Sequence, residues 1–285
     1  MASTFYFGTR GYMRDVRAPS INAGASSVRW QGTKALYLGG GAYIKSSVAS
    51  HKEYDFSWNL APRAELRKIT DFAMNQFGPG PFYWLDPFAM DVNLLPSYWG
   101  SPFVAGYDGP ILDGQASIRP ALVPTPANPY FYPIESAVFT IGTVTTRPSI
   151  WVPVAPGYTI WVGAHGVAGS GGTVVAIPTS GVVNTGTAVS LTMLPVTSST
   201  RVNQSFDGNT FNGVLISLGG SGTVTLSGLI VQVFPTGVTP PLGDFPSGQG
   251  NSGCAFENLP TLVEYSSGLD LIGITAKLIE INAWL

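Results

Sequence analysis

Charge is distributed so unevenly along this chain that the sequence divides into two segments of different character. The stretch from Asp113 to Gly250 contains no lysine and only seven charged side chains. The flanking segments hold the other charges and one amphipathic helical pattern. A low-charge stretch between two more charged ones predicts a β-type module inserted into a separate domain. We therefore expect one domain formed by residues 1–112 and 251–285, and a second formed by residues 113–250.

The composition favours a mainly β protein. The 285 residues include 35 glycines and 23 prolines, and only 11% are charged. Such a chain is typical of short strands joined by turns, and its length suits about two domains. A net charge of -2 offers no clustered basic surface, so we expect no sequence-specific nucleic-acid binding. Because 45% of the residues are hydrophobic, we expect part of the surface to be buried against other chains.

The single cysteine and the apolar runs limit location and redox chemistry. Cys254 has no partner for an internal disulfide and is expected to be a small buried thiol. No run of about 18 apolar residues is present, and the first residues lack the apolar core of a signal peptide. We therefore expect that the chain is made in the cytoplasm and does not insert into a membrane.

The first 80 residues predict several strands and one helix. Pro62 opens the helical segment APRAELRKITDFAMNQF, and Gly78 and Pro79 end it. Its expected buried stripe is Leu66, Ile69, Ala73 and Phe77. The expected strands are Thr4–Phe7, Ser27–Trp30, Ala35–Leu38, Ala42–Val48 and Glu53–Leu60, the last with strict alternation of apolar and polar side chains.

The next segment, GPGPFYWLDPFAMDVNLLPSYWG, combines aromatic side chains with proline and glycine. An apolar loop of this kind is typical of a contact surface. We expect an intersubunit or interdomain contact first, with internal packing and a ligand pocket as alternatives. The candidate oligomer or partner contacts are Phe82, Tyr83, Trp84, Phe88, Tyr98 and Trp99.

The inserted segment predicts a β-sandwich of the jelly-roll kind. Proline-rich connectors flank it, and seven strand-like runs are separated by turns. These runs are Ala137–Val144, Ser149–Val152, Tyr158–Ala164, Thr173–Ile177, Ala188–Leu194, Gly213–Leu218 and Thr223–Phe234. After the insert, Leu271–Leu285 reads as a long strand whose apolar parity changes at Ile279, which predicts either a bulge there or a strand that passes between two sheets.

The sequence carries no recognisable catalytic, cofactor or metal motif, so we expect no enzyme activity, no cofactor and no metal. Only two histidines occur, and His165 lies in a glycine-rich stretch that predicts a hairpin turn. Asp207 reads as a turn acid rather than half of a glycosidase pair. The aromatic side chains Trp151, Tyr158 and Trp161 are a candidate glycan platform, but core packing is the first expectation, because aromatics on alternating strand positions are more often core.

Two segments carry a resemblance to a known family. Residues 78–102, GPGPFYWLDPFAMDVNLLPSYWGSP, and residues 253–285, GCAFENLPTLVEYSSGLDLIGITAKLIEINAWL, resemble minor tail proteins of long-tailed (siphovirus-type) bacteriophages, of the distal tail protein group. The resemblance implies a β-barrel-like ring domain with one α-helix, completed by the C-terminal segment, that carries an inserted or appended β-sandwich of the galectin-like or carbohydrate-binding-like kind. It implies no catalytic residues.

The same resemblance implies a structural virion protein in the phage tail. It predicts a homo-oligomer, a hexamer first and a trimer as the alternative, that connects the tail tube protein to the tail-tip or hub proteins. Assembly would take place in the host cytoplasm. The alternative function is a receptor-binding minor tail protein that binds a host cell-wall glycan through the sandwich.

Overall fold

The computed structural model describes most of the chain, with gaps in the connectors. The described residues are 4–20, 25–28, 32–36, 42–46, 52–85, 92–100, 116–120, 135–141, 149–167, 170–195, 198, 200–242, 250, 253–266 and 270–281. Phe88, the ends of several expected strands, most of the first proline-rich connector and part of the second lie outside these ranges.

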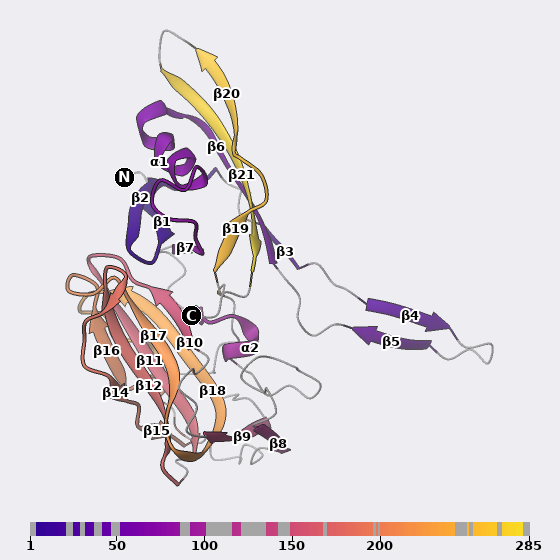
Figure 1. Cartoon of the computed structure of the whole chain (residues 1–285), viewed down its shortest axis with the longest axis vertical. Coiled ribbons are helices and arrows are strands. Elements are labelled where there is room, and N and C mark those ends of the chain that lie inside the picture. The colour runs from indigo at the N-terminus through magenta and orange to yellow at the C-terminus, as the bar shows by residue number, and fades with distance from the viewer. Residues whose placement is uncertain are drawn as a thin grey trace.

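An open, eight-stranded antiparallel sheet contains strands from both ends of the chain (Figure 1). Among the described residues its order is β2-β1-β7-β19-β21-β6-β3, and β20 pairs with β21. Its strands are β1 (Thr4–Thr9), β2 (Tyr12–Arg17), β3 (Ala25–Val28), β6 (Lys52–Pro62), β7 (Phe82–Leu85), β19 (Cys254–Phe256), β20 (Thr261–Ser266) and β21 (Leu271–Glu280). We call this sheet and its helix the terminal unit.

The mainly β architecture is confirmed, but the expected barrel-like closure is not seen in the described residues. β2 and β3 lie at opposite ends of the sheet order, and no pairing joins them. The helix α1 (Arg63–Ala73) instead packs on the sheet and buries Leu66, Ile69 and Phe72. Because a helix can cover the apolar face of an open sheet, the unit buries a core without closing.

Helix α1 is shorter than the sequence pattern predicts. It follows Pro62 and ends at Ala73, and Asn75 then adopts a left-handed φ of 60°. Phe77, expected in the helical stripe, lies beyond the helix and packs against Phe72 with ring centroids 5.0 Å apart. No helix in the described part of the chain has the length and apolar character needed to cross a membrane.

Strand β21 does not change parity where the sequence suggests. Its even-numbered side chains, from Ile272 to Glu280, remain buried, whereas Ile281 is 46% exposed. The expected bulge at Ile279 is therefore wrong. Glu280 keeps the inward position because its carboxylate accepts a hydrogen bond from the Lys52 backbone N–H at 3.3 Å. The irregularity in the β21–β6 pairing lies instead between Ile272 and Ile274.

The inserted segment forms two further sheets that pack face to face, which we call the sandwich. The five-stranded sheet contains β10 (Ser149–Pro153), β12 (Gly172–Ser180), β13 (Val183–Asn184), β14 (Val189–Ser190) and β17 (Gly213–Gly220). The six-stranded sheet contains β8 (Ala116–Pro120), β9 (Glu135–Ile141), β11 (Tyr158–Val167), β15 (Met193–Leu194), β16 (Gln204–Asp207) and β18 (Gly222–Pro235).

Alternating side chains of both sheets form one apolar core between them. Ile150 and Val152 of β10 and Ile216 of β17 face this core together with Val162 of β11. His165 lies in β11 and is fully buried, so the expected hairpin turn at this position is wrong. The pairing of β11 with β18 shifts register directly after His165, and this irregularity lets the strand continue past the glycines.

A separate two-stranded hairpin, β4 (Gly32–Leu36) and β5 (Ala42–Ser46), extends away from both units (Figure 1). It is antiparallel, with Thr33 opposite Lys45. A two-stranded hairpin on its own is marginally stable in water. This projection therefore has the form of an arm.

One buried side-chain amide attaches the segment that follows β7 to the sandwich. The Asn93 side chain donates from Nδ2 to the Leu229 carbonyl at 2.9 Å, and its Oδ1 accepts from the Val231 N–H at 3.0 Å. The Leu94 N–H also donates to the Val231 carbonyl, at 2.8 Å. Asn93 thus occupies the edge of β18 like a peptide group of a further strand.

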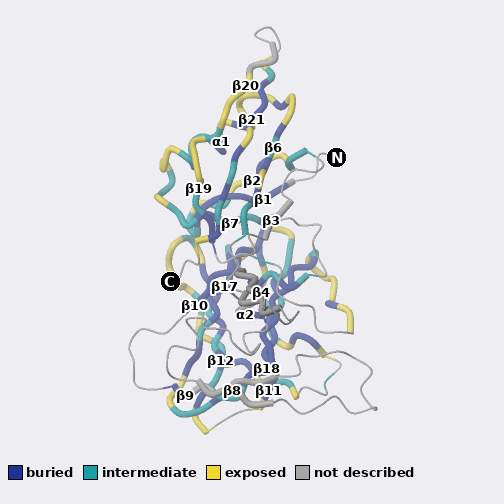
Figure 2. Tube along the Cα trace, turned by 90° about the vertical axis from the view of Figure 1, so that its right-hand side faces the viewer, coloured by how far each residue is buried: buried dark blue, intermediate teal, exposed yellow. Residues whose placement is uncertain are grey.

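The residues that follow Asn93 complete this attachment. Leu95 and Trp99 are fully buried in the sandwich core, and Trp99 belongs to the short helix α2 (Ser97–Gly100). Figure 2 shows buried segments continuing through both units. The segment 92–100, which the sequence assigned to the first domain, therefore packs with the second. We call it the clasp.

We predict that Asn93→Ala lowers the free energy of unfolding by about 3 kcal/mol, since it leaves buried backbone groups of β18 without a partner. Urea denaturation measures the change. The control is Asn203→Ala, because Asn203 is exposed and donates to the Thr192 carbonyl at the surface. We expect it to cost less than about 1 kcal/mol. Equal losses in the two variants would contradict the role of the clasp.

Candidate functional site

The turn between β1 and β2 docks against the sandwich. Asn212 donates from Nδ2 to the carbonyls of Arg10 and Gly181, the latter at 3.0 Å, and so connects both units. Arg10 in turn donates from its guanidinium to the Asn184 side-chain oxygen. A Cβ atom at Gly11 would lie 2.5 Å from Cγ1 of Val182, so the two turns approach each other closely.

A short polar chain fixes the orientation of Asn212. Trp151 donates from its indole to Oγ1 of Thr179 at 2.9 Å, and that hydroxyl donates to Oδ1 of Asn212 at 2.9 Å. With its oxygen occupied in this way, Asn212 must point its amide N–H groups at the two carbonyls. The polar contact between the units is therefore directional.

Apolar packing surrounds this chain. Tyr83 of β7 meets Trp151 edge to face, with ring centroids 4.7 Å apart. Leu215 completes the buried cluster, and Met13 packs against it from β2. Burial raises the pKa of Tyr83, which keeps its hydroxyl neutral. The terminal unit thus covers the outer face of the five-stranded sheet around Trp151 and Leu215.

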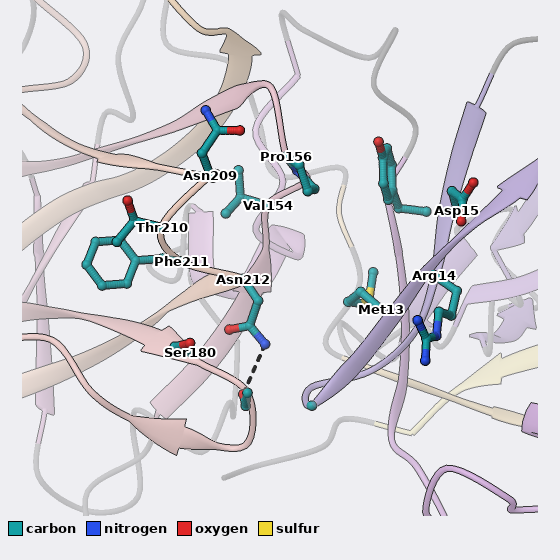
Figure 3. Close-up of a pocket in the computed structure, with 14 residues that line it drawn as sticks. Met13, Arg14, Asp15, Val154, Pro156, Ser180, Asn209, Thr210, Phe211 and Asn212 are labelled. Atoms are coloured by element: carbon teal, nitrogen blue, oxygen red, sulfur yellow. Dashed lines mark hydrogen bonds between the residues drawn. The ribbon is translucent and has the colours of Figure 1, made fainter.

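Beside this joint lies a cleft of about 590 Å³ (Figure 3). One wall comes from the terminal unit, where the lining residues are Tyr6 of β1, Gly11 of the turn, and Met13, Arg14 and Asp15 of β2. The opposite wall comes from three sandwich loops. Its lining residues there are Val154, Pro156, Ser180, Gly181, Gly208, Asn209, Thr210, Phe211 and Asn212. Clefts of this volume between domains are common ligand sites.

The sandwich wall is held rigidly. Asp207 accepts hydrogen bonds at Oδ1 from the N–H and from the side-chain amide of Asn209, each at 3.0 Å. Asn209 in turn accepts from the Gly157 N–H at 3.0 Å, which ties the loop to the β10–β11 turn. Asp207 is therefore a turn acid, as its sequence context predicts. A side chain at Gly208 would collide with the Ala155 carbonyl, so the loop sits tightly on that turn.

The charges of the other wall are arranged by strand parity. Asp15 pairs with Tyr6, and Figure 3 shows Asp15 and Met13 on the side of β2 toward the sandwich loops. Arg14 lies on the opposite side, where its guanidinium sits 5.9 Å from the centroid of the Phe77 ring. Lys68 contacts Oδ1 of Asp15 at 3.1 Å. The cleft is therefore lined from β2 by a carboxylate that an ammonium neutralises and by Arg14, whose guanidinium lies near the Phe77 ring.

The environment of Tyr6 shows that the cleft wall is partly desolvated. Burial raises the pKa of Tyr6, and the nearby Tyr158 and Asp15 raise it further. The hydroxyl therefore remains protonated at neutral pH and can donate a hydrogen bond.

The expected partner contacts lie mainly inside the chain. Phe82, Tyr83 and Trp99 are at most 3% exposed, so they offer no surface to another subunit. Tyr83 and Trp99 instead make the interdomain contacts that were one of the expected roles. Trp84 is half-buried and packs edge to face against Tyr54, with ring centroids 5.2 Å apart. Phe88 and the Tyr98 side chain lie outside the described residues.

The candidate glycan platform does not form. Trp151 is 1% exposed and faces the terminal unit. Tyr158 packs against the core between the sheets, whereas Trp161 packs on Val202 and Ile230 on the other face of the six-stranded sheet. Because residues three apart on a strand face opposite sides, these rings cannot form one binding surface.

Two titratable side chains, Cys254 and His165, are buried, and burial favours the uncharged form of each. Cys254 is fully buried, as expected, and burial raises its pKa, so it is not a reactive thiolate. His165 Nε2 lies 2.8 Å from the Arg201 carbonyl. Burial lowers the pKa of His165 to about 4, although the hydrogen bond to Arg201 acts in the opposite direction. Among the described residues, no group of three or more His, Cys, Asp or Glu side chains is placed to hold a metal ion.

Sequence reasoning missed the residues that line the cleft. Tyr6, Asp15 and Thr210 are separated by up to about two hundred positions, and no local pattern connects them. The one available signal was the turn-forming stretch around Asp207, which predicts a loop but not its neighbour. Comparisons with protein-family models, curated proteins and solved structures gave no match.

We predict that the free energy of unfolding falls as the pH decreases from about 6.5 to 4, in part because of His165. In this range the unfolded chain binds a proton at this histidine that the folded chain excludes. The full difference between the ordinary pKa of 6.5 and the folded value corresponds to roughly 3 kcal/mol. His165→Gln should flatten this part of the pH profile, measured by urea denaturation at each pH. His51→Gln is the control, and an equal flattening by it would refute the assignment.

We predict that Gly11→Ala destabilises the protein by about 1 kcal/mol, since its methyl group would collide with Val182. The double variant Gly11→Ala, Val182→Ala should recover most of that loss, because it removes the atom in the way. Chemical denaturation of the unmodified chain, the two single variants and the double variant gives the coupling free energy between the two positions. A penalty that is the same in both backgrounds would show that the two turns do not touch.

Proposed function

We propose that this chain is a structural component of a bacteriophage tail, which forms a ring between the tail tube and the tail tip. In this proposal the terminal unit makes the contacts between copies, and the sandwich projects from the ring toward neighbouring tail proteins. A homo-oligomer, a hexamer first, provides the central passage. No catalytic step belongs to this role.

The observation that carries the proposal is the set of unpaired edges on the terminal unit's open sheet. Within the described residues β2 and β3 end the sheet order, and β20 pairs with β21 alone. β20 exposes Leu262 by 50% and Val263 by 47%. Open strand edges bearing apolar side chains pair readily with another chain, and monomeric proteins usually protect them. Pairing between copies would satisfy these edges.

The β4–β5 arm supports the same proposal. It projects beyond the body of the chain (Figure 1), where a neighbouring copy could pack against it. An extended hairpin gains stability from such packing, which it lacks alone. An arm of this kind suits a protein whose stable form is an assembly.

The firm joint between the units supports a mechanical role for the sandwich. The clasp holds β18 through Asn93, and the docked β1–β2 turn holds Asn212. Two attachments at separate places restrict rotation of one unit against the other. A projecting module fixed in this way would keep a constant direction on every copy of a ring, as a connector between tail proteins requires.

We predict that the purified chain assembles, with a mass by size-exclusion chromatography and light scattering of six times the 30.0 kDa of one copy. Changing the β20 edge with Leu262→Glu and Val263→Lys should shift the mass to that of a single copy, since charge on an edge strand opposes pairing. The matched control is Val238→Lys, an equally exposed apolar residue on the sandwich.

The control variant should keep the mass of the unmodified chain. A wild-type chain that stays monomeric at high concentration, alone and mixed with tail tube protein, would contradict the ring. Assembly that survives both β20 substitutions would instead show that this edge is not the contact.

A further inference from the structure

We propose that the outer edge of β2 binds an extended acidic peptide of another protein, which adds to the terminal unit's sheet as a further strand inside the cleft. β2 is the last strand of the sheet order, so no other described strand pairs with its outer edge. An extended backbone is the natural complement of such an edge, because it supplies carbonyl and N–H groups at matching intervals. The inference goes beyond the ring and does not depend on it, since one copy of the chain supplies every residue of the site.

The register of the β1–β2 hairpin decides which backbone groups point outward. The tight turn closes on the opposed residues Thr9 and Tyr12, which such hairpins join by hydrogen bonds. Because hydrogen-bonded and non-hydrogen-bonded pairs alternate along an antiparallel ladder, the backbone groups of Met13, Asp15 and Arg17 point away from β1. At about 3.3 Å per residue these three positions span about 13 Å, which is enough for a short added strand.

Two side-chain contacts agree with this orientation and leave the edge rich in donors. Lys68 Nζ donates to the Asp15 carbonyl at 2.6 Å. Trp58 Nε1 donates to the Arg17 carbonyl at 2.7 Å. Both outward carbonyls are therefore occupied, whereas the outward N–H groups of Met13, Asp15 and Arg17 face no described strand. A row of N–H donors favours a ligand rich in acceptors, such as peptide carbonyls.

The cleft gives this edge a walled binding site. Met13, Arg14 and Asp15 all line it, although successive side chains of a strand point to opposite faces. Since β1 covers the inner edge of β2, the cleft reaches both faces around the outer edge. An added strand would therefore lie beside β2 and face the sandwich loop that carries Thr210 and Phe211.

Charge favours an acidic occupant. Arg14 and Arg17 are exposed, and within the described part of the chain neither takes part in an ion pair. Asp15, the acidic residue of β2, is neutralised by Lys68 at 3.1 Å. The edge is therefore basic, and two such edges would repel each other, which disfavours β2 of a second copy as the occupant. A strand that places a carboxylate opposite Arg14 is attracted instead.

The two faces of β2 set the pattern of side chains that the peptide should carry. On the face toward the sandwich, Tyr6, Met13 and Phe211 offer apolar surface (Figure 3). On the other face lies Arg14, whose guanidinium is 5.9 Å from the centroid of the Phe77 ring. Because the side chains of an added strand alternate in the same way, apolar and acidic residues should alternate along the peptide.

The wall opposite β2 is already in position. Asn209 and Asn212 use their side-chain amides within the protein, to hold the loop and the joint between the units. The cleft therefore does not have to reorganise to receive a strand. A preformed site reduces the entropy lost on binding.

The test is titration of the purified chain against a short fluorescent peptide in which valine alternates with glutamate, measured by fluorescence anisotropy. A companion peptide has the same sequence with N-methyl groups on alternate residues, which block backbone pairing. We expect saturable binding of the first with a Kd below about 1 mM, and none of the second. Equal binding of the N-methylated peptide, or of a short DNA duplex, would show a general attraction to negative charge and overturn the proposal.

Met13→Pro tests the edge itself. Proline removes the outward N–H of this residue but no hydrogen bond to β1, so the hairpin is retained. We expect it to weaken binding of the alternating peptide by about tenfold. Met13→Ala is the matched control, because it loses the same side chain beside Trp151 but keeps the N–H, and it should retain most of the affinity.

Arg14→Gln should weaken binding by about fivefold, through loss of the charge pair. Arg63→Gln is its control, since Arg63 is an exposed arginine at the start of α1 that pairs with Asp270, and it should leave the affinity unchanged. Thermal denaturation of every variant checks that it is folded.

The inference is overturned if the alternating peptide does not bind at millimolar concentration, or if Met13→Pro and Met13→Ala bind it equally. Light scattering on the same samples separates this outcome from the ring, since assembly without peptide binding would overturn the strand site alone.

Discussion

The pairing of β21 with β6 is the constraint on which the rest of the structure depends. It aligns the last described strand with residues 52–62, so the whole segment between them must leave and return at one place. The junction is closed by Lys52, whose Nζ donates to the Gly250 carbonyl at 2.9 Å. Gly250 in turn donates from its N–H to the Leu95 carbonyl, at 3.1 Å. Burial lowers the pKa of Lys52, while the neighbouring Glu280 acts in the opposite direction.

The two units are joined by contacts of different chemistry at different places. The clasp places an amide of Asn93 on the edge of β18, and Trp99 fills the sandwich core. The β1–β2 turn contacts the opposite sheet through Asn212 and the Tyr83–Trp151 pair. Because each contact involves a different sheet of the sandwich, a hinge at one of them would be opposed by the other. The cleft takes its form from this arrangement, with one wall on each unit.

Several features of the fold could be predicted from short stretches of sequence. The helix after Pro62 and the alternating strand from Tyr54 to Trp58 follow from periodicity, and both are present. The strands of the sandwich agree in most positions for the same reason. Errors occur where a polar residue is buried by a distant partner: Glu280 stays inward beside Lys52, and His165 enters a strand beside Arg201. Sequence periodicity predicts that such polar residues are exposed, because the distant hydrogen-bond partner that allows their burial is not part of the local pattern.

The aromatic residues also could not be placed from the sequence alone. The sequence favours a contact surface for Phe82, Tyr83 and Trp99 and a core position for Trp151, although an aromatic ring is suited to both. The sequence by itself determined the mainly β class, the position of the helix and the low-charge insert, since these depend on the propensity and charge of neighbouring residues. Only the tertiary structure decided which faces meet, where Asn93 finds the edge of β18, and that Tyr6 and Asp15 face Thr210 across a cleft. Those relations join residues far apart along the chain, and only the packing of the two units brings them together.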